Sequence, residues 1–213
     1  GERDKREEIA MLFYDSAMPA PNPRRVRIFA AEKGIELPST QVSIPQREQK
    51  APDFLAKNPR GQTPILELDD GKVIAESVAI MRYLEGLHPE PPLFGATPLE
   101  SAQVEMWSRR IELNLMTAVG AVWVHTHRFT AALPGRNEAW GEANRPRVAD
   151  AFRFFDQSLA GRDFLATDGY SVADILLLTT ADFAEFIGCG MPQDCENLRD
   201  WHQRVSARPS AQA

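Results

Sequence analysis

The chain has 213 residues, of which 43% are hydrophobic and 25% are charged, so it can bury one large core or two smaller ones. Its net charge of −6 argues against nucleic acid and anionic membranes as main partners, because both select a basic surface. No apolar run approaches the roughly 18 residues of a membrane span, and the charged residues 1–10 contain no signal-peptide core. We therefore expect a cytoplasmic protein whose fold begins at Met11, with residues 1–10 as an extension, native or added.

The first half of the chain carries short strand and helix signals in alternation. In order, they are an apolar strand at 11–14, a helix with Pro23 near its first turn and a left-handed cap at Gly34, a strand at 41–44, a helix at 52–57, a hairpin turning at Asp70-Gly71, and a helix at 77–87. This β-α-β-α-β-β-α order predicts a mixed four-stranded sheet that resembles thioredoxin-like folds.

The second half reads as helical after a stiff linker at residues 88–92, which contains three prolines. Apolar residues recur at helical spacing over 99–133 and again over 137–159. A third helix opens at Ser171, where Asp174 completes a capping box. The two cysteines, Cys189 and Cys195, form neither a C-x-x-C pair nor a metal-binding pattern, so we expect no metal site. In a reducing cytosol we expect free thiols, and a disulfide between the two stays an open alternative.

Two short motifs carry the chemistry. Gln62-Thr63-Pro64 opens one strand of the hairpin, and a proline there leaves its neighbour's backbone groups to bind another chain. Glu76-Ser77 stands where the partner strand gives way to a helix, and a serine with free helix amides behind it is a carboxylate receptor. Together they suit an extended peptide with an α-carboxylate and an α-amine. This combination resembles the cytosolic glutathione transferase family, over essentially Met11 to Pro209.

The resemblance implies a thioredoxin-like glutathione-binding domain at 11–87, a linker at 88–92, an all-helical domain at 93–213, and a homodimer. It implies that Glu76 takes the γ-glutamyl ammonium of glutathione, while the Ser77 hydroxyl takes the carboxylate. Thr63, before an expected cis Pro64, would bind the cysteinyl backbone. The remaining contacts would come from Gln62 beside the peptide and from Gln49 and Lys50 at the glycine carboxylate.

The pattern breaks at the group that activates the thiol, since alignment puts Ala20 where most of the family has a serine. Ser16 lies too early in this alignment and Tyr14 lies inside the first strand, but both stay candidates, as does Asn22 near the helix start. The amides of that helix also favour a thiolate. An atypical branch of the family, which this chain resembles, instead uses a water held by a histidine and a serine or threonine.

The histidines at issue are His125 and His127, which point about 200° apart on a helix, so both cannot face one cleft unless the helix bends or ends. An apolar wall for the electrophile would comprise Met18, Met116, Val119 and Trp123. We therefore predict transfer of glutathione thiolate to hydrophobic electrophiles. Two alternatives stay open: a glutathione-dependent peroxide or disulfide reductase, which the lack of a cysteine near Ala20 disfavours, and a non-catalytic binding module.

Overall fold

The computed structural model describes residues 10–17 and 19–213, and the chain divides after His88 into two compact units. Met18, expected in the electrophile site, and residues 1–9 of the expected extension lie outside the described residues. The first unit contains β1 (Met11–Asp15), α1 (Pro21–Lys33), β2 (Ser39–Gln41), η1 (Glu48–Lys50), α2 (Pro52–Lys57), β3 (Ile65–Leu68), β4 (Val73–Ala75) and α3 (Ser77–Leu87).

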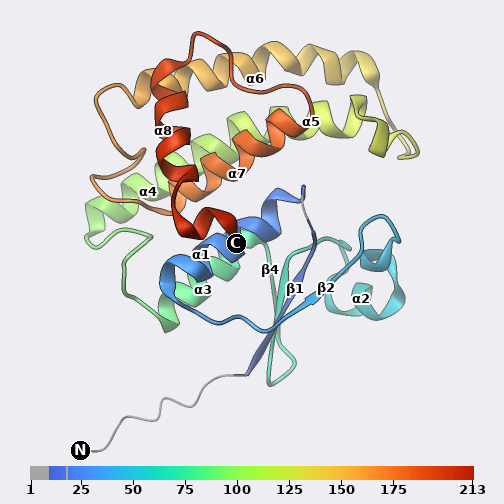
Figure 1. Ribbon diagram of the computed structural model, residues 1–213. Coiled ribbons are helices and arrows are strands. Elements are labelled where there is room, and N and C mark those ends of the chain that lie inside the picture. The colour runs from blue at the N-terminus through green and yellow to red at the C-terminus, as the bar shows by residue number, and fades with distance from the viewer. Residues whose placement is uncertain (1–9, 18) are drawn as a thin grey trace, which may run out of the picture. The chain divides into compact units, whose positions relative to one another are not determined.

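The four strands form one sheet in the order β2-β1-β3-β4, in which β2 runs parallel to β1 while β3 and β4 are antiparallel to their neighbours. Figure 1 shows α1 and α3 side by side on one face of this sheet and α2 on the other. Alternation along β1 explains the two layers, because Phe13 and Tyr14 must point to opposite faces. Tyr14 packs with Val42, Phe54 and Ile65 under α2. The predicted thioredoxin-like arrangement is confirmed.

Several boundaries agree with the sequence prediction because their signals are local. Gly34 ends α1 with a φ of 64°, and its amide reaches the carbonyls of Ala30 and Ala31. The turn between β3 and β4 has Gly71 at a φ of 78°. The expected strand at 41–44 was wrong in position, since β2 pairs only up to Gln41. β1 ends at Asp15, whose carbonyl accepts from the Val42 amide at 2.8 Å, so later residues have no strand to pair with.

The second unit is helical and contains α4 (Pro98–Arg110), the π-helical segment η2 (Ile111–Met116), α5 (Thr117–Thr126), η3 (Arg128–Thr130), α6 (Glu138–Ser158), α7 (Val172–Phe186), α8 (Glu196–Ser206) and η4 (Pro209–Gln212). The predicted capping box is present at the start of α7, where Asp174 accepts from the Ser171 amide at 3.0 Å. Asp174 also accepts from Trp201 Nε1 at 2.9 Å, which ties α8 to α7. None of the described helices is long and apolar enough to cross a membrane.

The helical segment expected over 99–133 ends earlier, at Thr126. His127 is extended, with φ −74° and ψ 146°, and Thr130 Oγ1 donates to the carbonyl oxygens of Trp123 and His127, each at 2.8 Å. The Trp123 carbonyl still accepts the helical bond from the His127 amide, but the His127 carbonyl accepts from Thr130 while the Ala131 amide bonds the Arg128 carbonyl, so the α-helical pattern stops here. The sequence prediction also did not separate α8 from the rest of the helical half.

Candidate active site

The hairpin brings the two predicted binding motifs to the same end of the sheet. Ile65 on β3 pairs with Ala75 on β4, and the residues just outside this pair are Pro64 and Glu76. The Thr63-Pro64 peptide bond is cis, which confirms the expectation from the sequence. An extended peptide that binds Thr63 would thus run toward the start of α3.

The start of α3 has features of an anion receptor. Ser77 is 5% exposed, and Glu76 before it is exposed with a φ of 72°, a region that non-glycine residues rarely occupy. Within the described chain, Glu76 makes no side-chain capping hydrogen bond to the first turn. The amides of that turn and the helix dipole therefore favour a negatively charged group at Ser77.

A buried arginine from α1 reaches the same serine. Arg25 is 2% exposed, and its Nη1 lies 3.4 Å from Ser77 Oγ. At this distance the hydrogen bond is long, but it places a guanidinium group beside the serine. The binding motif at Ser77 thus includes a positive side chain from a helix far away in the sequence.

Thr63 is hydrogen-bonded to Ser16, the residue that follows β1. Ser16 has no exposed surface, and its hydroxyl donates to the Val42 carbonyl at 3.0 Å. Its oxygen lies 2.8 Å from Thr63 Oγ1, which must then be the donor, because the single Ser16 proton is already used. This is the geometry of a residue that fixes the Thr63 loop.

Gln49 and Lys50 lie beside the other end of the same loop. Lys50 Nζ donates to the carbonyls of Arg60 and Gly61, at 3.0 and 2.9 Å. Gly61 has a φ of 58°, and a Cβ there would come within 2.7 Å of the Gln49 carbonyl, so only glycine allows this approach. Gln49 Oε1 is a buried acceptor without a hydrogen-bond partner in the described structure. Both residues therefore lie beside Gly61, which precedes the exposed Gln62.

The start of α1 offers fewer amides than the sequence suggested. The helix begins at Pro21, so two of its first three residues are prolines and lack an N–H. The first-turn amides that are left belong to Asn22 and Arg24. Ala20 occupies the N-cap and has no side-chain hydrogen-bonding group. Asn22, half-buried, is the uncharged residue of this turn whose side chain can donate a hydrogen bond to an anion.

His125 of the helical unit caps the next helix. Its Nδ1 accepts from the Asn137 amide at 3.0 Å, and Asn137 is the N-cap of α6. Because the backbone N–H must be the donor, neutral His125 carries its proton on Nε2.

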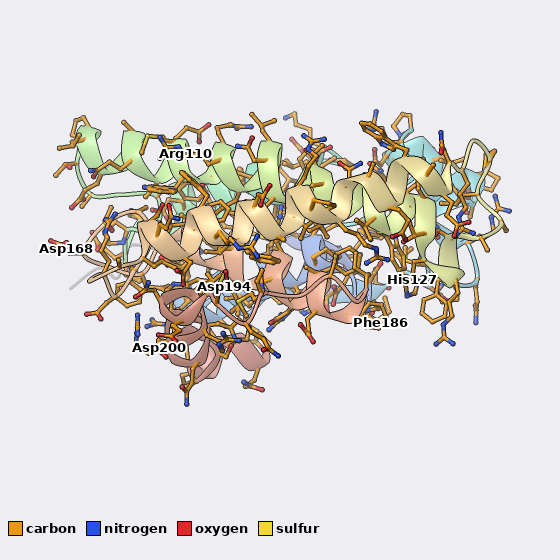
Figure 2. The ribbon with its side chains drawn as sticks, turned by 90° about the horizontal axis from the view of Figure 1, so that it is seen from above. Arg110, His127, Asp168, Phe186, Asp194 and Asp200 are labelled. Atoms are coloured by element: carbon orange, nitrogen blue, oxygen red, sulfur yellow. The ribbon has the colours of Figure 1, made fainter. Side chains whose placement is uncertain are left out.

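His127 lies in an aromatic cluster. Its ring centroid is 4.6 Å from that of Trp123 and 4.9 Å from that of Phe129, and Figure 2 shows it together with Phe186 at one end of the helical unit. Burial, and secondarily the charge of Arg128, lowers the pKa of His127. Its Nδ1 accepts from the Phe129 amide at 3.2 Å, so the neutral ring likewise has its proton on Nε2.

The residues expected to line the electrophile site differ in exposure. Met116 and Trp123 are half-buried, whereas Val119 has no exposed surface and is part of the helical core. Among the residues that the structure describes, no group of three or more His, Cys, Asp or Glu side chains is placed to hold a metal ion.

Comparison with known proteins identifies the family. The sequence profile of the glutathione S-transferase N-terminal domain matches residues 20–87, and that of the C-terminal domain matches residues 114–209. Glutathione S-transferase 2 of Saccharomyces cerevisiae is 39% identical over 99% of this chain and 90% of its own length. The chain belongs to the glutathione S-transferase family.

Solved structures of other glutathione S-transferases agree. Gtt2 of S. cerevisiae superposes with a TM-score of 0.88 and 36% identity, covering 94% of this chain and 98% of its own. A glutathione S-transferase domain-containing protein of Marinobacter aquaeolei gives 0.88 and 38%, covering 93% and 98%. The two-domain fold and the general activity, glutathione transfer, are therefore those expected from the sequence.

Two residues near the candidate site of this glutathione S-transferase were not predicted from the sequence. Arg25 contacts Ser77 across 52 residues of sequence, and no local pattern distinguishes it from its neighbours Arg24 and Arg27. Asn58, which directly follows the helix expected at 52–57, is 7% exposed and donates from Nδ2 to the Gln62 carbonyl at 2.8 Å. A buried asparagine just after a short helix is a signal that could have suggested this role.

Proposed function

We propose that this glutathione S-transferase conjugates the glutathione thiolate to hydrophobic electrophiles, with the thiolate stabilised by helix amides and a bound water. The observation that carries the proposal is the convergence of Thr63-Pro64 and Glu76-Ser77 at one end of the β3–β4 hairpin. Glu76 binds the γ-glutamyl ammonium, and Ser77 with the α3 amides binds its carboxylate. Thr63 pairs with the cysteinyl backbone, with Gln62 beside it, and Gln49 and Lys50 serve the glycine carboxylate.

The thiol loses its proton to water, and the thiolate then attacks an electrophilic carbon. A carbon–sulfur bond forms, and the leaving group departs with its bonding electrons. Ser16 is buried and its proton is engaged, which supports activation without a direct hydroxyl. Asn22 and the first-turn amides of α1 stabilise the sulfur, and His125 holds the water through Nε2–H. His127, with its aromatic neighbours, is the second candidate for that role.

Met116 and Trp123 are the proposed apolar contacts for the electrophile, because both keep exposed surface. The reductase alternative finds no support in the cysteines. Cys189 and Cys195 are free, and burial raises the pKa of Cys189 to about 11, so its reactive thiolate is scarce at neutral pH. Membership of an enzyme family likewise favours catalysis over a non-catalytic module.

We also propose a homodimer. Leu99, Met106 and Leu113 recur every seven residues on the continuous α4–η2 helix and are 69%, 40% and 64% exposed. Large apolar side chains repeated along one helical face are typical of a surface that another helix covers. The cytoplasmic location expected from the sequence stays a prediction.

Replacement of Ser77 tests the glutathione site. Ser77→Ala should weaken glutathione binding by about 1–3 kcal/mol, the range for a charge-assisted hydrogen bond, as measured by calorimetry. Ser158→Ala, which removes an exposed hydroxyl on α6, is the matched control and should leave the affinity unchanged. Unchanged affinity in a folded Ser77→Ala protein would contradict the assignment of the carboxylate to Ser77.

Replacement of His125 tests whether this residue holds the water that bonds to the glutathione sulfur. His125→Asn keeps an acceptor near Nδ1 for the Asn137 amide but removes Nε2–H. It should lower kcat about tenfold and raise the pKa of the bound glutathione thiol, read from thiolate absorbance. His88→Ala, an exposed histidine in the first unit, should change neither. A normal thiol pKa in His125→Asn would transfer the role to His127 or Asn22.

A further inference from the structure

We propose that Arg25 is a positioning residue for glutathione, which acts through Ser77 to strengthen binding of the γ-glutamyl carboxylate. The inference rests on the proposed function, because it takes the start of α3 as the carboxylate subsite. Arg25 is 2% exposed and Ser77 is 5% exposed, so their contact is shielded from solvent. An interaction between charged and polar groups is stronger in such surroundings than at the surface.

The direction of the hydrogen bond fixes what Ser77 can offer a ligand. A guanidinium only donates, so Ser77 Oγ is the acceptor in the 3.4 Å contact with Arg25 Nη1. The hydroxyl proton of Ser77 is then free to point at an incoming carboxylate. Arg25 thus turns Ser77 into a donor and adds a positive charge behind it, without touching glutathione itself.

A second cation links the same two helices and shows what a purely structural bridge looks like. Lys33 lies eight residues after Arg25 on α1; its Nζ forms an ion pair with Glu85 Oε2 and donates a hydrogen bond to the His88 carbonyl at the end of α3. A cation there is favoured by the helix dipole, because the C-terminal end carries partial negative charge.

Arg25 has the opposite arrangement. It brings a cation to the N-terminal end of α3, where the dipole is positive and disfavours it. A carboxylate bound at Ser77 makes this arrangement favourable, because the helix amides and the Arg25 guanidinium then both attract the same anion. Glu76 is exposed at this end and is assigned to the ammonium. The position of Arg25 therefore suits ligand binding better than helix stability.

The experiment compares glutathione with an analogue in which 4-aminobutanoate replaces the γ-glutamyl residue, so that only the α-carboxylate is missing. Calorimetry is run on the full chain for the wild type, Arg25→Met, Arg25→Lys, Ser77→Ala and the Arg25→Met/Ser77→Ala pair. Lys33→Met is the matched control, as it removes a buried cation of the same helix pair at the other end. Thermal unfolding verifies that each variant is folded.

We expect Arg25→Met to weaken glutathione binding about tenfold and to leave binding of the analogue unchanged. The KM for glutathione should rise while kcat at saturating glutathione stays within about twofold, because only ground-state binding is lost. Arg25→Lys should recover part of the affinity, and the double variant should bind no more weakly than Ser77→Ala alone. Lys33→Met should keep the wild-type preference for glutathione over the analogue.

The outcomes separate the two proposals. A wild-type protein that binds glutathione and the analogue equally has no carboxylate subsite at Ser77, and the proposed function loses that assignment. A wild type that prefers glutathione, with Arg25→Met and Arg25→Lys keeping the same preference, overturns the role of Arg25 alone. Equal losses for both ligands in Arg25→Met make the effect one of helix packing and also overturn it. So does a Lys33→Met protein that loses the preference for glutathione as Arg25→Met does.

Discussion

Ser16→Ala separates a catalytic hydroxyl from a structural one. The wild-type hydroxyl has no exposed surface, donates to the Val42 carbonyl at 3.0 Å, and accepts from Thr63 Oγ1 at 2.8 Å. Alanine removes the oxygen and leaves both partners without that bond, in a place that water does not reach. The change therefore perturbs the Thr63 loop by removing a buried hydrogen bond that holds it.

The expected magnitudes follow from this geometry. Loss of the two bonds should lower the free energy of unfolding by about 1–3 kcal/mol, as read from urea denaturation. Thr63 should become less well held, so the KM for glutathione should rise a few-fold. The pKa of the bound thiol should stay at its wild-type value, because a hydroxyl with no exposed surface cannot donate to a ligand's sulfur.

A matched control is available in the helical unit. Ser108 Oγ is buried and has no hydrogen-bond partner within the described structure, so Ser108→Ala should preserve or raise stability and leave the KM unchanged. The reasoning is refuted if Ser16→Ala raises the thiol pKa by a unit or more while stability stays near wild type. In that case Ser16 donates directly to sulfur, and this protein is an ordinary serine-type transferase.

Two further predictions concern assembly and pH. Leu113→Glu should convert the proposed dimer into a monomer in light-scattering measurements, because it places a charge in the exposed stripe with Leu99 and Met106; an unchanged mass would show that this face is not the interface. Burial raises the pKa of Asp174 to about 6, opposed by hydrogen bonds from Leu165, Trp201 and Ser171. The folded protein then holds a proton that the unfolded chain releases, so the free energy of unfolding should fall as pH rises from about 4 to 6, and Asp174→Asn should remove that slope in denaturation curves measured at each pH.

The parts of the fold that the sequence predicted are those set by local interactions. The β3–β4 hairpin follows from its Asp70-Gly71 turn, and the start of α7 follows from Ser171 and Asp174, three residues apart. The position of β2 could not be predicted in this way. It depends on where β1 ends, and therefore on a pairing partner 26 residues away in the sequence.

The residues of the candidate site likewise differ in whether local sequence or long-range contacts define them. Thr63, Pro64, Glu76 and Ser77 could be found because they flank one hairpin. Arg25 and the role of Ser16 could not, since each is defined by a contact about 50 residues distant, at 52 and 47. The consequence for the alignment is specific. A serine one residue beyond β1 looks like a displaced catalytic residue, whereas in the fold its hydroxyl bonds the Val42 carbonyl and the Thr63 hydroxyl.

The histidine tautomers constrain the mechanism of thiol activation. In both His125 and His127, Nδ1 already accepts a backbone amide, from Asn137 and Phe129, so neither ring can take the thiol proton through Nδ1. Nε2 carries a proton in the neutral ring and in the charged ring alike. A histidine held in this way can serve a ligand as a hydrogen-bond donor through Nε2, and not as a general base. If one of them holds the water at the sulfur, the rise of kcat/KM with pH should follow the pKa of the glutathione thiol alone. A second ionisation in that limb, absent in His125→Asn, would instead identify a histidine that gains and loses a proton during turnover.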